Sequence, residues 1–567
     1  MKTHRSWQCN LFIILHLDIF CTPRSNRLQK SQVTTGFARR TVRHRWGQAS
    51  LALARTGPLA QWSAAEGNAA LRGGLPPAGT RSTVLKRDCP HRRRRPGRRP
   101  TDTPIAKHSN SPFIPLRIAA YSTMSIRATL NSDSAHREKE KRMRGLEGVK
   151  VVELTGYVAA PACLRILGEM GATVYKIEPF TGDEYRTNGP AFGMDKTEVD
   201  DPAFDLASLN KEFLSVNLKD PEGMAFLERL LADADIMVTS FRDKALKKLG
   251  LDYESVHKRH PHLVWGQMRG YGEHGPERDT KGFDTTAYAA RGGFLASLPQ
   301  AGEGYQPINW PAAIGDWNSS ITLTAGLLAA LVRKERTGEG DKVTTTLHHN
   351  ALWAMQIMLA SSQFGDKWPK SRYEATCPSN NTYRTKDGVW FIICYGSYDL
   401  FFEHLMTSIG LTSILGDERY TTSAAINNES GGNTEVIKML EQHFLTEDWT
   451  HWEPIFQENE IPYQRLYLPD DILHDEEAFA NDALRTLHYD AFGDKVLPTS
   501  PVRLGSVGDP ELHRSRPVGY DTARIMEEYG YSDEDIQRLD GTAVKLYKGP
   551  ALPDSVMEPS YGPHSMR

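Results

Sequence analysis

The feature that most restricts the fold is a strand–helix–strand pattern that begins near residue 148. Gly148–Leu154, GVKVVEL, is a β-branched apolar run typical of a strand buried on both faces, and Thr173–Glu178, TVYKIE, is a second one. Between the two runs, a helical pattern begins around Pro161 and ends at Gly171. This segment therefore predicts a β–helix–β unit with parallel strands.

The same alternation continues along the chain. Further strands are predicted at Asp235–Phe241, His262–Tyr271 and Lys342–Leu347, with helical patterns between them. Strands that alternate with helices predict an α/β fold built on an open, Rossmann-like sheet. The first turn lacks G-x-G-x-x-G and the chain has no P-loop, which disfavours a plain dinucleotide or nucleoside-triphosphate enzyme.

The pattern changes after about residue 350. His348–Phe364 is predicted to be one long connecting helix, and GVWFIICYG then reads as a strand followed by amphipathic helices, which predicts a smaller α+β domain. The predicted domains are a basic extension (1–144), the first part of a large α/β domain (145–350), a linker helix (351–374), the small domain (375–471), and a return linker with the rest of the large domain (472–567).

Residues 1–144 differ in charge from the rest of the chain. They carry 28 Lys and Arg against 7 Asp and Glu, whereas the remaining 423 residues carry 40 against 63. The first part is predicted to be disordered: a targeting segment, an unstructured extension or upstream sequence before a true start at Met124. Pro115–Met124 has the Arg- and Ser-containing, acid-free look of a mitochondrial presequence end. The prediction is a cytoplasmic or mitochondrial protein.

Composition argues against several partners. No aromatic-plus-basic pattern of a folded nucleic-acid module accompanies the arginines, so no nucleic acid is expected. No segment of the body has an uninterrupted apolar run of membrane length, so no membrane is expected. The six cysteines show no zinc spacing or disulfide framework, which fits a reducing compartment. His348 and His349 have no further ligand nearby, and no metal site is predicted.

Asp316 is the one position where the residues alone leave two interpretations open. It stands in AAIGDWNSS, immediately before a long helical pattern. A short acceptor side chain there can cap the helix by accepting hydrogen bonds from its first N–H groups. Alternatively, Asp316 is a reactive carboxylate directed from a helix N-terminus into a site. The local sequence favours the cap.

Five stretches, taken together and in order, resemble the family III CoA-transferases, the CaiB/BaiF group. They are GVKVVELTGYVAAPACLRILGEMGATVYKIE, SLNKEFLSVNLKDPEG, ADIMVTSFRDKALKKLGLDY, GDWNSSITLTAGLLAALVRKERTGEGDKV and PVGYDTARIMEEYGYSDEDIQRL. The resemblance covers about 145–548. It implies an acyl-CoA:carboxylate CoA-transferase with coenzyme A as substrate, no tightly bound cofactor, a large domain split in sequence and an intertwined homodimer.

The resemblance also assigns residues. Asp316 matches the family's catalytic carboxylate, which attacks a thioester to form an anhydride and then an aspartyl-CoA thioester, and Asp284 matches a second acidic position near the active site. A turn residue is the alternative reading of Asp284. The positions implied to bind coenzyme A are Tyr157, Val158, Ala159, Asn210, Lys211, Phe241, Ala245, Lys248, Arg269 and Lys281.

Departures from related branches bear on the substrate. The formyl-CoA:oxalate branch has His and Gln where this chain has Gly156 and Val158, so oxalate is disfavoured as acceptor and a bulkier carnitine-like, aryl or hydroxy acid is favoured. The related 2-methylacyl-CoA racemases need an acid/base on each face of an enolate. Their His is replaced here by Phe283, which cannot carry a proton. The third alternative, a non-catalytic CoA- or nucleic-acid-binding protein, is disfavoured by the presence of Asp316.

Overall fold

The computed structural model describes residues 145–564, apart from 429–430 and 506–507. The predictions made for 1–144, a disordered basic extension and a targeting segment, lie outside the described residues.

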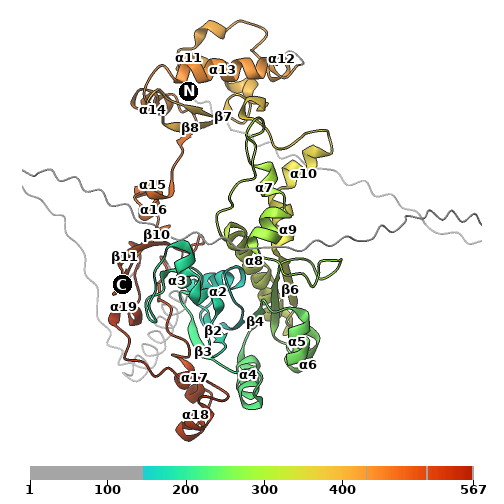
Figure 1. The fold of residues 1–567 in the computed structure, drawn as a ribbon, viewed down its shortest axis with the longest axis vertical. Coiled ribbons are helices and arrows are strands. Elements are labelled where there is room, and N and C mark those ends of the chain that lie inside the picture. The colour runs from blue at the N-terminus through green and yellow to red at the C-terminus, as the bar shows by residue number, and fades with distance from the viewer. Residues whose placement is uncertain (1–144, 429–430, 506–507, 565–567) are drawn as a thin grey trace, which may run out of the picture. The chain divides into compact units, whose positions relative to one another are not determined.

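A six-stranded, all-parallel sheet forms the centre of the first 200 described residues (Figure 1). Its order is β3-β2-β1-β4-β5-β6. The strands are β1 (Lys150–Leu154), β2 (Thr173–Glu178), β3 (Glu212–Ser215), β4 (Ile236–Thr239), β5 (Val264–Arg269) and β6 (Lys342–Thr346). The sheet confirms the predicted α/β class. The strand β3 was not predicted from the sequence, although β4, which has the same length, was.

Helices cover both faces of this sheet. The helices of this part are α2 (Ala159–Glu169), α3 (Pro202–Ser208), α4 (Pro221–Asp233), α5 (Asp243–Leu249), α6 (Tyr253–Arg259), α7 (Phe294–Ser297), α8 (Ile314–Thr337), α9 (Leu347–Ala354) and α10 (Gln356–Ser362). Val151 and Ile236 pack with α2 and α8 on one face, whereas Val152 and Met237 pack with α4 and α6 on the other. The alternation follows from the two-residue period of a strand.

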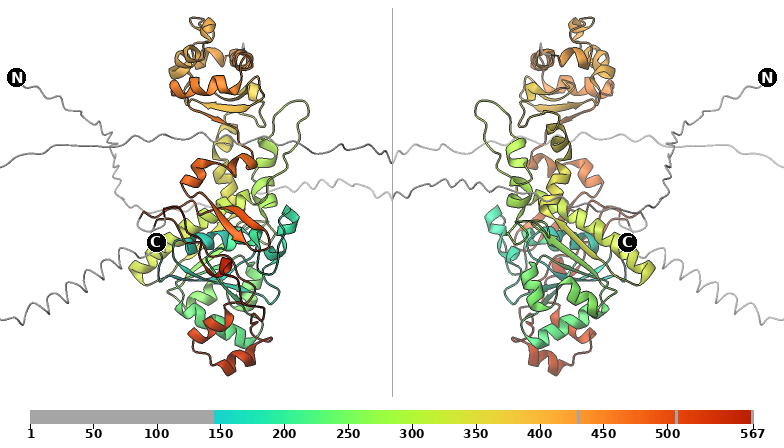
Figure 2. Two further views of the ribbon diagram at one scale, coloured as in Figure 1. Left: turned by 90° about the vertical axis from the view of Figure 1, so that its left-hand side faces the viewer. Right: turned by 90° about the vertical axis from the view of Figure 1, so that its right-hand side faces the viewer.

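The C-terminal segment contributes to the second face. It contains α17 (Thr522–Glu528), α18 (Asp533–Leu539) and α19 (Asp554–Met557). Ile525 and Leu539 belong to the same buried cluster as Phe226 of α4, and Figures 1 and 2 show α17 and α18 beside α4. Residues more than 290 positions apart in sequence therefore share one hydrophobic core.

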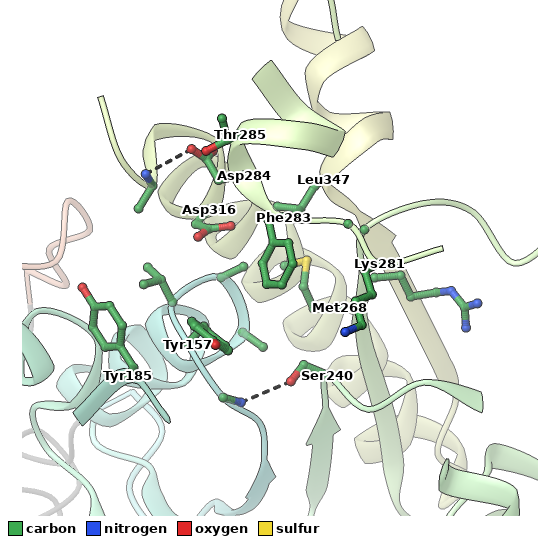
Figure 3. A pocket seen from close by; sticks show the side chains of 18 of the residues that line it. Tyr157, Tyr185, Ser240, Met268, Lys281, Phe283, Asp284, Thr285, Asp316 and Leu347 are labelled. Atoms are coloured by element: carbon green, nitrogen blue, oxygen red, sulfur yellow. Dashed lines mark hydrogen bonds between the residues drawn. The ribbon is translucent and has the colours of Figure 1, made fainter. Parts of the chain in front are cut away.

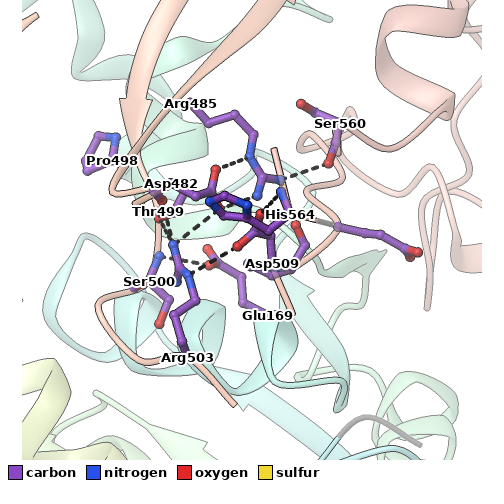
Figure 4. Close-up of polar contacts among 12 residues, drawn as sticks. Glu169, Asp482, Arg485, Pro498, Thr499, Ser500, Arg503, Asp509, Ser560 and His564 are labelled. Carbon is purple, nitrogen blue, oxygen red and sulfur yellow. Dashed lines mark hydrogen bonds and ion pairs between the residues drawn. The ribbon is translucent and has the colours of Figure 1, made fainter. Parts of the chain in front are cut away.

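A buried ionic cluster joins this segment to α2 (Figure 4). Before the C-terminal helices come α15 (Pro469–Ile472), α16 (Glu476–Ala480) and the antiparallel hairpin of β10 (Leu484–Tyr489) and β11 (Gly493–Pro498). Arg485 donates from Nε to Asp482 at 2.8 Å and from Nη1 to the Ser560 carbonyl at 2.9 Å. The Ser500 N–H donates to Glu169 of α2 at 2.9 Å.

A second sheet, with its own core, lies within 375–471. Antiparallel strands β7 (Asn380–Arg384), β8 (Trp390–Cys394) and β9 (Tyr463–Arg465) accompany α11 (Tyr398–Ser408), α12 (Ser423–Ile426), α13 (Gly432–Phe444) and α14 (Trp449–Glu458). Phe391, Phe444 and Trp452 belong to its buried cluster. The α+β prediction thus describes the observed elements, although only β8 of these strands was predicted; β7, β9 and the hairpin strands β10 and β11 were not.

The predicted long helix at His348–Phe364 is wrong in detail. The structure has two helices, α9 and α10, separated at Met355, whose backbone (φ −90°, ψ 9°) leaves helical values. Neither Gly nor Pro marks the break, so the sequence carries no signal for it. Residues 363–379 contain no α-helix, and the linker helix predicted over 351–374 ends at Ser362.

Candidate functional site

A cavity of about 830 Å³ opens at the carboxyl ends of the parallel strands (Figure 3). It is lined by Gly156–Ala160 after β1, Ser240–Arg242 after β4, Gln267–Tyr271 at the end of β5, and Leu347 after β6. The strand order reverses direction between β1 and β4. Chain connections leave β1 and β4 in opposite directions at such a point, which opens a crevice where ligands of α/β sheets bind.

Asp284 and Asp316 both line this cavity, and Asp284 is the residue that caps helix α8. Its carboxylate accepts hydrogen bonds from the N–H groups of Ala313 at 3.0 Å and Gly315 at 2.6 Å, and from Trp310 Nε1 at 2.6 Å. These backbone groups are among those that a helix start leaves without partners. The cap therefore comes from a segment 30 residues earlier in the chain.

The interpretation of Asp316 as the N-cap is wrong. The N-cap position of α8 is Ala313, in the left-handed conformation (φ 66°), and Asp316 lies inside the first turn. Because Asp284 satisfies the helix start, the Asp316 carboxylate is available to the cavity. Gly315 makes the arrangement possible: a Cβ there would lie 2.4 Å from Asp284 Oδ1 and 2.2 Å from the Tyr288 ring.

Burial, together with a smaller effect of the negative charge of Asp284, raises the pKa of Asp316 to about 7. Burial also raises the pKa of Asp284, against the opposing effect of its hydrogen bonds from Trp310 and the backbone. A carboxylate with a pKa near neutrality is a stronger base than an exposed one, and strongly shifted groups in a cleft are typical of functional sites.

We expect the activity of this site to depend on pH through Asp316. If the ionised carboxylate is the reactive form, kcat/KM should rise with pH and reach half of its plateau near pH 7, since this ratio reports the free enzyme. Asp284→Asn removes a negative charge that raises the pKa of Asp316, so this pKa should fall. The acid limb, the part of the pH profile in which kcat/KM rises, should then move to lower pH. Asp279→Asn, at an exposed carboxylate outside the cavity lining, should leave the limb in place. An unchanged limb in Asp284→Asn would contradict this electrostatic coupling.

A buried ionic network holds the turn that follows β1. Lys176 Nζ lies 2.8 Å from both Glu153 Oε1 and Asp183 Oδ2, and Lys211 Nζ lies 2.8 Å from Glu153 Oε2. Asp183 Oδ1 accepts from the Tyr157 N–H at 3.2 Å. Tyr157 is held in the left-handed conformation (φ 64°), a backbone state that is rare for bulky residues and typical of functional turns.

Two predicted coenzyme-binding residues belong to the supporting structure instead of the cavity lining. Lys211 is 2 % exposed, donates to the Pro161 carbonyl at 2.8 Å, and has a pKa lowered to about 8 by burial. The Asn210 side chain donates to the Glu511 carbonyl and accepts from the His513 N–H. Both were selected from a stretch of family resemblance, which does not distinguish a contact from its support.

The other predicted residues lie in or beside the cavity. Those that line it are Tyr157, Val158, Ala159, Phe241, Arg269, Lys281, Asp284 and Asp316. Ala245 and Lys248 are exposed on α5, the helix that begins directly after the lining residue Arg242. Arg269 is ion-paired with Asp243 at 2.5 Å, whereas no carboxylate of the described residues pairs with Lys281.

Several lining residues were not predicted from the sequence. Glu184, Tyr185, Phe192 and Trp317 all line the cavity, and Trp310 holds Asp284. Glu184 and Tyr185 follow β2, so their position at a strand end was the available signal. Between residues 145 and 564, the structure has no group of His, Cys, Asp and Glu suited to a metal ion. In the same part of the chain, no helix has the length and apolarity needed to cross a membrane.

Comparisons with known proteins agree with this geometry. A family model described as CoA-transferase family III matches residues 146–522. Over 404 residues the chain is 36% identical to a cinnamoyl-CoA:phenyllactate CoA-transferase of Clostridium sporogenes, covering 71% of this chain and 97% of that protein. Over 402 residues it is 37% identical to an (R)-2-hydroxy-4-methylpentanoate CoA-transferase of Clostridioides difficile, covering 71% and 100%. A CaiB/BaiF family crystal structure from Brucella suis, 25% identical, matches 68% of this chain and 99% of that one with a TM-score of 0.56.

Proposed function

The chain belongs to CoA-transferase family III, and on this premise we propose that it moves coenzyme A between an acyl-CoA and a free carboxylic acid through the side chain of Asp316. The observation that carries the proposal is the partly buried Asp316 carboxylate, free of capping, in a cavity at the switch point of the sheet.

The chemistry proceeds through two covalent intermediates. The Asp316 carboxylate attacks the thioester carbonyl, the C–S bond breaks, and coenzyme A leaves as a thiolate with formation of a mixed anhydride. The thiolate attacks the Asp316 carbonyl of the anhydride, which releases the first acid and forms an aspartyl-CoA thioester. The incoming carboxylate attacks this thioester, the C–S bond breaks, and a new anhydride forms with release of the coenzyme A thiolate. The thiolate then attacks the acyl carbonyl of the new anhydride, which restores the Asp316 carboxylate and releases the new acyl-CoA.

Each addition step creates an oxyanion that needs hydrogen-bond donors. Ala159 and Ala160, in the first turn of α2, line the cavity, and no side chain caps this helix at Val158. The N-termini of α2 and α8 thus both adjoin the cavity and contribute positive ends of helix dipoles. These features support a role in stabilising the oxyanion.

Cationic side chains on one side of the cavity support binding of the coenzyme A phosphates. Arg242 follows β4, and Arg278 and Lys281 lie in the loop after β5. This loop passes very close to the end of β5, where Gly282 of the loop contacts Gly270. The contact requires glycine, since a Cβ on Gly270 would lie only 2.4 Å from Gly282 Cα. The close crossing positions Lys281 and Phe283 at the cavity, with Lys248 outside it on α5.

We infer that the acid is a bulky, apolar 2-hydroxy monocarboxylate. Tyr185, Phe192, Phe283 and Trp317 line the same cavity as Asp316, and such a wall favours aryl or branched side chains. The two relatives described above carry the names of phenyllactate and 2-hydroxy-4-methylpentanoate, which share this chemistry. Phe283 also removes the acid/base that racemisation would need at that position.

A covalent trap tests the mechanism directly. The enzyme, incubated with an acyl-CoA and then with hydroxylamine, should yield a hydroxamate on the peptide that contains Asp316, detected by mass spectrometry. Hydroxylamine captures both the anhydride and the aspartyl thioester, since each is an activated acyl group. Exchange activity together with an unmodified Asp316 peptide would contradict covalent catalysis by this residue.

We further propose that two copies of the chain form the functional unit. The α9–α10 region exposes several large apolar side chains, among them Trp353 (69%), Ile357 (81%) and Phe364 (92%). Clustered exposure of this kind marks interaction surfaces, and an intertwined dimer of the predicted type would cover them. The shape of such a dimer stays a prediction.

The oligomeric state can be measured by light scattering. The protein should have about twice the 63.6 kDa mass of one chain at micromolar concentration. Ile357→Glu places a charge on the apolar surface and should shift the protein towards monomer, because a buried unpaired charge is costly. Ile357→Leu keeps the surface apolar and should remain dimeric. A monodisperse wild-type monomer would exclude the dimer.

A further inference from the structure

Glu184 is a carboxylate in the cavity wall that the transfer chemistry does not use. It follows β2, at the start of a short 3₁₀ helix, Glu184–Thr187. The Tyr157 hydroxyl donates to Glu184 Oε2 at 2.5 Å, which raises the pKa of Tyr157. The backbone N–H of Tyr157 donates to Asp183, the residue before Glu184. Two consecutive acidic residues therefore hold the backbone and the hydroxyl of this tyrosine, whose backbone is left-handed.

The Glu184 carboxylate keeps free hydrogen-bonding capacity. A carboxylate has about four acceptor sites, and Tyr157 uses one of them. No Lys, Arg or His of the described chain forms an ion pair with Glu184. Glu184 is exposed, and it shares the cavity lining with the aromatic residues Tyr185, Phe192 and Trp317.

The cationic side chains of the cavity and Glu184 follow different strands of the sheet. The cations follow β4 and β5, on one side of the switch point, whereas Glu184 follows β2, on the other. Coenzyme A phosphates favour the cationic side. The acyl group of a thioester bound there, with its carbonyl at Asp316, then extends towards the side that carries Tyr157 and Glu184. Figure 3 shows Tyr157, Phe283 and Asp316 around the same cavity.

From this division we propose that Glu184, oriented by Tyr157, determines which acids the enzyme accepts: it accepts a hydrogen bond from the 2-hydroxyl group of the substrate and repels a second carboxylate. The proposal rests on the proposed function and assigns its selectivity to one side chain. A hydroxyl donated to a charged acceptor strengthens binding, whereas a second carboxylate near Glu184 would be a like-charge contact without a cation.

Three acids with one donor separate the two roles. With cinnamoyl-CoA as donor, kcat/KM is measured for phenyllactate, for 3-phenylpropanoate, which lacks the hydroxyl, and for glutarate, a dicarboxylate. The wild-type enzyme should prefer phenyllactate to 3-phenylpropanoate by about 10- to 100-fold, the range expected for a hydrogen bond to a charged group. Glutarate should be the poorest of the three acids.

Two variants then distinguish charge from hydrogen bonding. Glu184→Gln removes the charge but keeps an acceptor oxygen, so the penalty on glutarate should fall while much of the preference for phenyllactate remains. Glu184→Leu removes both the charge and the acceptor. The kcat/KM values for phenyllactate and 3-phenylpropanoate should then differ by no more than about 3-fold, which is much less than the effect of one hydrogen bond. Ratios between acids cancel any general loss of activity from a structural disturbance. Glu198→Gln, at a carboxylate outside this cavity, should keep the wild-type ratios.

The outcomes separate this inference from the proposed function. Wild-type exchange with unchanged acid ratios in both Glu184 variants would overturn the role of Glu184 and leave the transferase chemistry intact. A preference for a quaternary-ammonium acid that is lost in Glu184→Gln would also overturn it, because Glu184 would then pair with a cation. Absence of exchange with every acid would overturn the proposed function and this inference together.

Discussion

Asp316→Asn should fold normally and lose CoA exchange by several orders of magnitude, because an amide can form neither the anhydride nor the aspartyl thioester. The backbone of Asp316 should remain in place, since the first turn of α8 is capped by Asp284 and not by the Asp316 side chain. Exchange is measured by chromatography of the acyl-CoA products, and folding by circular dichroism.

Stability provides an independent check on this variant. The folded-state pKa of Asp316 is about 7, above the value of about 3.9 in an unfolded chain. Because the folded protein binds this proton more tightly than the unfolded chain, the contribution of Asp316 to the free energy of unfolding falls as pH rises between these two values. The loss is complete above pH 7. Asn carries no charge, so at pH 8 the melting temperature of Asp316→Asn should equal or exceed that of the wild type. Near-wild-type exchange by a folded Asp316→Asn protein would exclude the mechanism.

Lys176→Met should produce the largest loss of stability among the substitutions considered, about 3–5 kcal/mol, the usual effect of removing one partner from a buried ion pair. Lys176 is fully buried, and Glu153 and Asp183 together hold its pKa above the ordinary value although burial opposes this. Without Lys176, the buried Asp183 loses its 2.8 Å ion pair, and Glu153 keeps Lys211 as its ion-pair partner.

The measurement is the denaturant midpoint, compared with a matched control in the neighbouring strand. Lys150 of β1 pairs with Asp233 at an exposed position, where both side chains retain solvent contact. Lys150→Met should therefore change the free energy of unfolding by no more than about 1 kcal/mol. If both Met variants unfolded at similar denaturant concentrations, the network would not be the main support of the β1–α2 turn. A changed KM for acyl-CoA in Lys176→Met would further connect the ionic network to the cavity, because Asp183 of this network also holds the backbone of Tyr157.

The fold was largely predictable because its signals are local. The strand β1 and the helix α2 appear in the sequence as a β-branched run and a helical pattern bounded by Pro161 and Gly171. Three short strands were not predicted, although β7 is as long as the predicted β1 and β3 is as long as the predicted β4. These strands are defined by their pairing, β3 with β2 and both β7 and β9 with β8. The break at Met355 was equally hidden, because no residue there is a helix breaker.

The sequence alone was enough to select Asp316 as the candidate catalytic residue, through a family resemblance spread over the whole body, and to place it at the start of a long helix. What only the tertiary structure decided is what caps that helix. The first N–H groups of a helix take any acceptor that packs against them, and Asp284, from a separate loop, accepts from them here.

Likewise, Lys211 is chemically able to bind a phosphate, but folding buries it against Glu153. Glu184 has no sequence motif at all; it reaches the cavity because parallel strands bring their carboxyl ends together at one edge. Residue type determines what a side chain can do, but its partners are set by contacts between segments far apart in the chain.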